Sequence, residues 1–247
     1  MQWALAQLLN SPELELRYVL TAGPGLHEAR AKIVAKMLEI GGQGGVPIGL
    51  GCDEQPARAG TAFEGEPELA HGPWVDGYDL SAYAGEVHED GVGELVRMVM
   101  ASEEPLTVIA IGPLGNIGEA LSREPRIAPK LHFVGMQGAV YRGYASSKYP
   151  RGRPVDPVKG WEYNVWADIP SSQTTFAAPW ASMTITPLDT CGLAKLSGAE
   201  FARIRDSPAP LARAVMENYR IWHPRFGGGK HGHDLETESS VLFDCVA

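Results

Sequence analysis

The chain has 247 residues, 44% hydrophobic and 21% charged, which is ordinary for a globular protein long enough to bury a sizeable core. Its formal net charge of −9 argues against the phosphates of nucleic acid or an anionic membrane as partner. We expect no membrane partner either, because no apolar run is long enough to span a bilayer and no basic-then-apolar leader is present. The three cysteines are widely spaced and fit neither a zinc site nor a disulfide framework, so the expected location is the reducing cytoplasm.

The first third of the chain predicts two strand and helix pairs. Apolar residues at helical spacing predict a helix over 1–10, and a strand follows over 16–21. An apolar stripe at helical spacing predicts a second helix over 28–40, and we expect a short strand over 46–51. The segment 52–85 is rich in Gly, Pro and Glu and weakly periodic, so we expect a long functional or mobile loop there.

The rest of the chain continues the alternation. We expect helices over 91–101, 116–122, 169–177, 198–205 and 209–222, strands over 106–111, 131–136 and 183–187, a second polar excursion over 138–160, and a last helix from Ser239. Alternating strands and helices predict an α/β fold with an open, mainly parallel sheet and helices on both faces. No linker or repeat divides the chain, so we expect a single domain over 1–247.

The segment L-T-V-I-A-I-G-P-L-G-N-I-G-E, which begins at Leu106, is the most informative part of the chain. Its apolar run predicts a strand buried on both faces, and the Pro in its G-P turn suits the first turn of a helix. A strand end and a helix start therefore meet at the carboxyl rim of the sheet, where open α/β proteins bind ligands.

This segment resembles the G-P-L-T-N signature of the inosine–uridine-preferring nucleoside hydrolases, with Gly115 in place of Thr. The segments F-V-G-M-Q-G-A-V, W-E-Y-N-V-W-A-D, T-P-L-D-T-C-G and S-S-V-L-F-D-C-V-A resemble further parts of that family in the same order. Together they extend over nearly the whole chain. The combination is more specific than any one segment.

The resemblance implies hydrolysis of ribonucleosides to base and ribose with the help of one Ca²⁺ ion, in purine and pyrimidine salvage. Carried over by position, the Ile111 carbonyl and Asp244 are expected metal ligands, and Glu162 and Asn164 are expected to hold the ribose hydroxyls. Asn116, in the signature itself, is a further expected substrate-binding residue. Family members are commonly dimers or tetramers, so the resemblance leaves a homo-oligomer open.

Each of these residues also has a simpler interpretation. Any strand end carries a free carbonyl like that of Ile111, and Asp244 suits the first turn of a helix. Glu162 and Asn164 also fit as loop polar residues. His71, in A-H-G-P-W-V-D-G, resembles the family's H-G turn and is expected to be structural.

The chain also departs from the family pattern. The family's D-x-D-x-G-x-D-D segment, with the strand that carries it, is not among the 247 residues, so we expect an N-terminally incomplete fold whose first strand is missing. Pro24 replaces an Asn, and Phe243 replaces a catalytic His. His233, or else His231, is a weak candidate for the acid, although a loop His without a role is the simpler interpretation. With so few carboxylates, Ca²⁺ binding is expected to be weak.

Three explanations of the missing segment stay open. The printed sequence is part of a longer active hydrolase, or it is a catalytically impaired protein that binds ribose or nucleoside without turnover, or another chain supplies the missing carboxylates. Two other enzyme classes fit less well. The glycines of G-P-L-G-N-I-G have the wrong spacing for a dinucleotide-binding oxidoreductase, and no G-x-S-x-G elbow marks a catalytic-triad hydrolase.

Overall fold

The computed structural model describes residues 1–23, 26–52, 70–141, 162–224 and 234–247. The elements are α1 (Gln2–Leu9), β1 (Val19–Leu20), α2 (His27–Ile40), β2 (Ile48–Gly49), η1 (Gly72–Val75), η2 (Leu80–Ala82), β3 (Val87–His88), α3 (Gly91–Ala101), β4 (Leu106–Ala110), α4 (Gly115–Arg123), η3 (Pro125–Lys130), β5 (Leu131–Met136), α5 (Tyr163–Ala167), α6 (Ile169–Ala177), β6 (Ser182–Thr186), α7 (Leu188–Cys191), α8 (Gly198–Arg205), α9 (Pro210–Trp222) and η6 (Phe243–Val246). Among these helices, none is both long and apolar enough to cross a bilayer.

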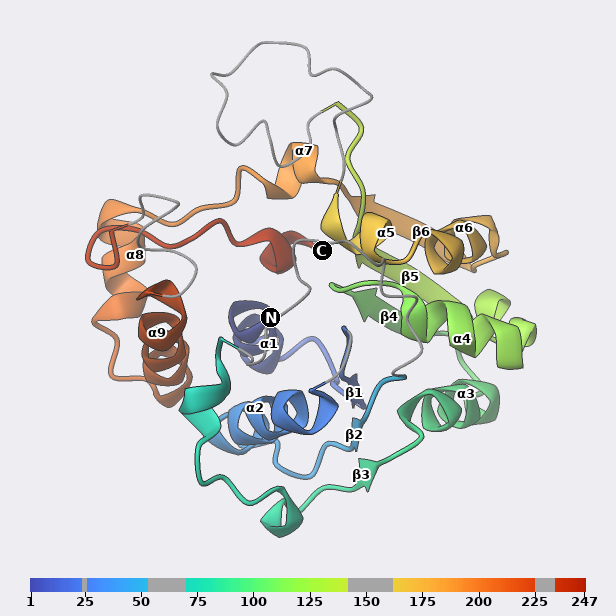
Figure 1. The fold of residues 1–247 in the computed structure, drawn as a ribbon, viewed down its shortest axis with the longest axis horizontal. Helices are drawn as coiled ribbons and strands as arrows, with labels where there is room; N and C mark the ends of the chain where they lie inside the picture. The colour runs from blue at the N-terminus through green and yellow to red at the C-terminus, as the bar shows by residue number, and fades with distance from the viewer. Residues whose placement is uncertain (24–25, 53–69, 142–161, 225–233) are drawn as a thin grey trace.

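The described strands form two parallel sheets of three strands each (Figure 1). One has the order β1-β2-β3 and the other β4-β5-β6, and every pairing within them is parallel. The expected α/β class with parallel strands and flanking helices is therefore confirmed. The strands do not form one continuous sheet, however, because β1 and β4 have no hydrogen-bonded pairing with each other.

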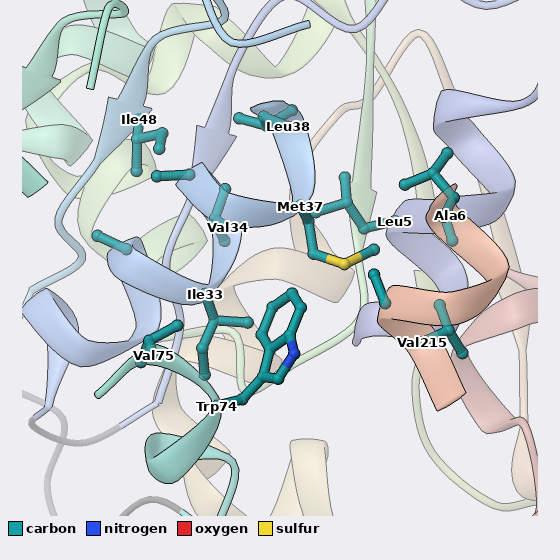
Figure 2. Packing of buried hydrophobic residues seen from close by; sticks show 14 of the residues in the cluster. Leu5, Ala6, Ile33, Val34, Met37, Leu38, Ile48, Trp74, Val75 and Val215 are labelled. Carbon is teal, nitrogen blue, oxygen red and sulfur yellow. The ribbon is translucent and has the colours of Figure 1, made fainter. Parts of the chain in front are cut away.

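Each sheet has its own core. Around β2, the helix α2 buries the side chains of Ile33, Val34, Met37 and Leu38 against α1, η1 and α9 (Figure 2). Around β4 and β5, the helices α3 and α4 bury a second cluster that includes Phe133 and Leu114. Apolar residues at helical spacing in α2 and α3 thus place one face of each helix in a core, as their patterns predict.

Several predicted elements differ from the structure. The last helix expected from Ser239 is only the single turn η6, whose last carbonyl, that of Val246, accepts a hydrogen bond from the Thr186 hydroxyl at 2.8 Å and is held by β6 instead of by a further helical turn. Within the expected loop 52–85, Trp74 and Val75 of η1 are buried in the first core, so this part of the segment is structural. Short elements such as β3, α5 and α7 lack a full period of apolar residues and were not predicted.

Candidate functional site

The carboxyl ends of β4, β5 and β6 gather residues from distant parts of the chain; we call this edge the rim. Ile111 directly follows β4 and packs in a small apolar cluster with Met136, at the end of β5, and Cys191 of α7. Phe243, of the C-terminal turn η6, belongs to the same cluster. The turn that carries Asp244 therefore lies beside the carboxyl ends of β4 and β5.

Asn164 and Glu162 lie on this rim because α5 begins there. Asn164 is buried, and its Nδ2 donates to the carbonyl oxygen of Met136 at 2.9 Å. Glu162 is also buried, and its carboxylate accepts hydrogen bonds from the backbone N–H groups of Gly138, Asn164 and Val165 at 2.7–3.0 Å. The carboxylate thus caps the start of α5 and ties it to the turn after β5.

Asp244 is the carboxylate of the described rim that was expected to bind a metal ion. Its Oδ2 lies 2.8 Å from the amino group of Met1, and the two form an ion pair. Figure 1 shows the two chain ends close together beside α1. Both carboxylates also act on Cys191. Burial is the main cause that raises the pKa of its thiol to about 12, and the negative charges of Glu162 and Asp244 add to this shift.

Asn116 lies at the start of α4 and is 4% exposed. Its Nδ2 donates to the carbonyl of Thr21 at 2.8 Å, and its Oδ1 accepts from the N–H of Cys52 at 2.9 Å. Thr21 and Cys52 follow β1 and β2, so Asn116 joins the two sheets at their carboxyl ends. Both ends of its amide are engaged by the backbone.

His71 lies away from the strand ends, next to α9. Its ring stacks on Trp222 with 6.2 Å between centroids and an interplanar angle of 7°. Burial is the main cause that lowers the pKa of His71 to about 4, and the positive amino group of Met1 adds to it. A histidine that stays neutral in an aromatic stack fits the expected structural role. His231, His233 and Pro24 lie outside the described residues.

Gln137 is a rim residue that the sequence analysis did not single out. It is 1% exposed, and its Nε2 donates to the carbonyl of Gly112 at 2.9 Å, bridging the ends of β5 and β4. Its Oε1 is buried without a hydrogen-bond partner among the described residues. A signal was available in the sequence, because Gln137 stands where the family pattern M-G-G has glycine.

The described residues do not fit a Ca²⁺ site by themselves. In this part of the chain no three His, Cys, Asp or Glu side chains come together in a way that would hold a metal ion. Ca²⁺ takes six to eight oxygen ligands, several of them carboxylate, whereas the expected ligands at the described rim are Asp244 and the Ile111 carbonyl.

A cavity of about 720 Å³ opens between β1 and β4 and reaches the rim. It is lined by backbone and side chains of both strands, by apolar residues of α1 and α3, and at the rim by Ile111, Asn116 and Asn164. Three of the site residues expected from the sequence, Ile111, Asn116 and Asn164, therefore border one hollow, whose walls belong to the two separate sheets, whereas Glu162 and Asp244 do not line it.

The sequence model of the inosine-uridine preferring nucleoside hydrolases matches residues 2–247. The chain belongs to this family. The inosine-uridine preferring nucleoside hydrolase of Crithidia fasciculata is 27% identical over 220 residues, which are 87% of this chain and 65% of that protein. The pyrimidine-specific ribonucleoside hydrolase RihA of Salmonella paratyphi B is 24% identical, with the same coverage. The chain thus spans somewhat less than two thirds of these relatives.

Solved structures show the same fold. A plant nucleoside hydrolase, the PpNRh1 enzyme, superposes with a TM-score of 0.73 at 16% identity, over 99% of this chain and 72% of that one. A purine-preferring ribonucleoside hydrolase from Gardnerella vaginalis superposes with a TM-score of 0.64 at 22% identity, over 91% of this chain and 71% of that one. The nucleoside-hydrolase-like architecture is therefore shown for this chain.

Proposed function

We propose that the protein acts on ribonucleosides at the rim and hydrolyses their N-glycosidic bond to release base and ribose. The observation that carries the proposal is the convergence of Ile111, Glu162, Asn164 and Asp244, which are far apart in sequence, on the carboxyl ends of β4 and β5. Family membership supports the same reaction class.

In this proposal Glu162 and Asn164 hold the ribose hydroxyls. Both are held rigidly by backbone hydrogen bonds of 2.7–3.0 Å, so they need little reorganisation when substrate binds. Cleavage of an N-glycosidic bond develops positive charge on the ribose ring, and a fixed carboxylate beside the ring stabilises that charge. His233 stays a prediction for the group that protonates the leaving base.

A second function, ribonucleoside binding without turnover, is favoured by one observation. In the described part of the chain Asp244 is the one expected metal carboxylate at the rim, and no three His, Cys, Asp or Glu side chains come together there in a way that would hold a metal ion. A site with Glu162 and Asn164 but without a strong metal or an assigned base would keep the sugar contacts and lose the activation of water. Loss of a general base alone costs typically 10²–10⁴-fold in rate.

Two measurements on the same protein separate these functions. Inosine and uridine are incubated with the 247-residue chain, with and without added Ca²⁺, and ribose release is followed by a reducing-sugar assay while nucleoside binding is followed by calorimetry. Ribose release above the blank supports hydrolysis, and binding without release supports the second function. Absence of both overturns the proposal.

Substitution of Asn164 by Ala tests the rim itself. We expect Asn164→Ala to weaken nucleoside binding about tenfold or more, since a lost hydrogen bond at a buried site costs about 1–3 kcal/mol. Asn10→Ala is the matched control, because Asn10 bonds only within its own region, to the Ala6 carbonyl at 2.9 Å. Equal effects of the two substitutions on binding would contradict the assignment of Asn164.

A further inference from the structure

The side chain of Gln137 joins the ends of β4 and β5 beyond their last paired residues. The backbone register of the two strands ends with Ala110 opposite Gly135. Past that pair, the Nε2 of Gln137 lies 2.9 Å from the carbonyl oxygen of Gly112 and 3.4 Å from that of Ala110. A side-chain amide thus takes the place of the next backbone donor of β5 and continues the ladder past the strand ends.

This contact fixes the direction of the carbonyl between the two. In an extended segment, successive carbonyl groups point to opposite edges of the strand. The carbonyls of Ala110 and Gly112 both point toward β5, since one nitrogen contacts both. The Ile111 carbonyl therefore points away from β5, to the side on which Ile111 borders the hollow together with Asn116 and Asn164.

The backbone at the Ile111 carbonyl has no other restraint of this kind from β5. Ile111 lies beyond the last paired residue of β4, and it precedes Gly112, a residue type with an unusually wide range of backbone conformations. Because the peptide groups on both sides are held by one amide, the Ile111–Gly112 peptide between them has little room to rotate. Gln137 supplies the restraint that the strand ladder no longer gives there.

The acceptor half of the same amide indicates why the residue is a glutamine. Gln137 is buried, and its Oε1 has no hydrogen-bond partner among the described residues. The reverse orientation of the amide would set Oε1 against the Gly112 carbonyl oxygen, and two acceptors repel, so Nε2 is the donor. An unsatisfied buried acceptor costs at least as much as one hydrogen bond gains, so an apolar side chain of this length would serve folding equally well.

Two hydrogen-bond acceptors lie at the ends of these neighbouring strands. One is the Ile111 carbonyl after β4. The other is the Oδ1 of Asn164, whose Nδ2 donates to the Met136 carbonyl at the end of β5. Neighbouring strands lie about 4.8 Å apart. A vicinal diol presents two hydroxyl donors on adjacent carbons, so the 2′ and 3′ hydroxyls of one ribose can reach both acceptors.

We propose that Gln137 is a positioning residue, which orients the Ile111 carbonyl to accept a hydrogen bond from the 2′,3′-diol of a ribonucleoside. This role rests on the proposed function for its ligand and on the contacts of Gln137 for its geometry. Recognition of the sugar then depends on a side chain that itself touches no sugar. The substrate class that it favours is the ribonucleoside over a nucleoside without the diol.

Two nucleosides and two variants test this role. Gln137→Met keeps the length of the side chain and removes its hydrogen bonds, and Gln173→Met is the matched control on the exposed surface of α6. Binding of inosine and of 2′,3′-dideoxyinosine to the 247-residue chain is measured by calorimetry. We expect Gln137→Met to weaken inosine binding at least about tenfold and dideoxyinosine binding less than about twofold. Gln173→Met should leave both affinities unchanged.

A structural measurement tests the same role without a nucleoside. Crystal structures of the unsubstituted chain and of Gln137→Met give the direction of the Ile111 carbonyl in each. We expect the Ile111–Gly112 peptide to rotate or to lose its single conformation in the variant, while the ladder up to Ala110 is unchanged. The urea midpoints of Gln137→Met and Gln173→Met should agree closely, because removal of the buried acceptor offsets the lost hydrogen bond.

Each outcome supports or contradicts a different statement. Equal weakening of inosine and dideoxyinosine binding by Gln137→Met would overturn the proposal, and so would unchanged binding of both. A large loss of stability in that variant would show that the amide is kept for folding, and an unchanged Ile111 carbonyl would show that Gln137 does not orient it; either result overturns the role. An unsubstituted chain that binds no inosine, with a rotated peptide in the variant, would count against the proposed function alone.

Discussion

The side-chain amide of Asn116 links the carboxyl ends of the two sheets by two hydrogen bonds, so replacing Asn116 tests how strongly the two sheets are held together. Asn116→Ala leaves the carbonyl of Thr21 and the N–H of Cys52 without their partners at 2.8 and 2.9 Å. An unsatisfied buried group costs about 1–3 kcal/mol. Thr21 is 3% exposed and takes the full cost, whereas half-buried Cys52 regains some water. We expect a loss of about 2–4 kcal/mol.

The measurement is urea unfolding followed by tryptophan fluorescence, together with the thermal midpoint. For a domain of this size each kcal/mol shifts Tm by about 2–4 °C, so Tm should fall on the order of 10 °C. Asn10→Ala, which removes a bond to its own helix region, is the matched control and should cost less than about 1 kcal/mol.

Asn116→Asp refines the test at nearly constant volume. The carboxylate still accepts from Cys52, but its second oxygen faces the Thr21 carbonyl, and two acceptors repel each other. Stability should therefore be lost at neutral pH and partly regained in acid, where a protonated carboxyl donates again. The reasoning is refuted if Asn116→Ala unfolds like Asn10→Ala. Weakened nucleoside binding at unchanged stability would instead support Asn116 as a substrate-binding residue.

Three further predictions concern other buried groups. The pKa of His71 is lowered to about 4 in the folded protein, against 6.5 normally. Its contribution to the free energy of unfolding is therefore complete above pH 6.5 and falls by up to about 3 kcal/mol as the pH is lowered toward 4. H71Q should show a shallower pH dependence of the urea midpoint. Cys191, whose pKa is raised to about 12, should resist iodoacetamide at about pH 8 until urea unfolds the chain, and equal labelling before and after would contradict this. A methyl group on Gly49 would overlap the Tyr18 hydroxyl, so Gly49→Ala should cost about 1–3 kcal/mol, whereas Gly45→Ala, in open space, should be nearly neutral; similar unfolding curves would refute the clash.

Much of the fold could be predicted from the sequence, because long periodic segments carry their own signal. The apolar stripes of α2 and α3 and the runs of β4 and β5 have the spacing of the structures they form. The segments that resembled a known family were also enough to predict it, as the match over residues 2–247 confirms.

The extent of the short strands and the polar contacts could not be predicted in this way, although the strands expected over 16–21 and 46–51 do contain β1 and β2. β1 and β2 have only two paired residues each, and β3 has no apolar run, so pairing with neighbours decides their extent. In the sequence, Gln137 is notable only because it stands where the family pattern has glycine. Its hydrogen bond to the Gly112 carbonyl forms because the ends of β4 and β5 lie side by side. For Glu162 the sequence indicated a ligand-binding residue, and the structure adds its cap on α5.

The sequence by itself determined the α/β class and the family, and it predicted that Ile111, Glu162, Asn164 and Asp244 lie at the rim, since local periodicity and motif order need no knowledge of distant contacts. Only the tertiary structure decided that the strands form two sheets, that Asn116 joins them, and that Asp244 pairs with the Met1 amino group. The physical reason is that each of these features depends on backbone groups brought together from distant parts of the chain. A local sequence pattern does not predict which strands pair at an edge such as that of β4.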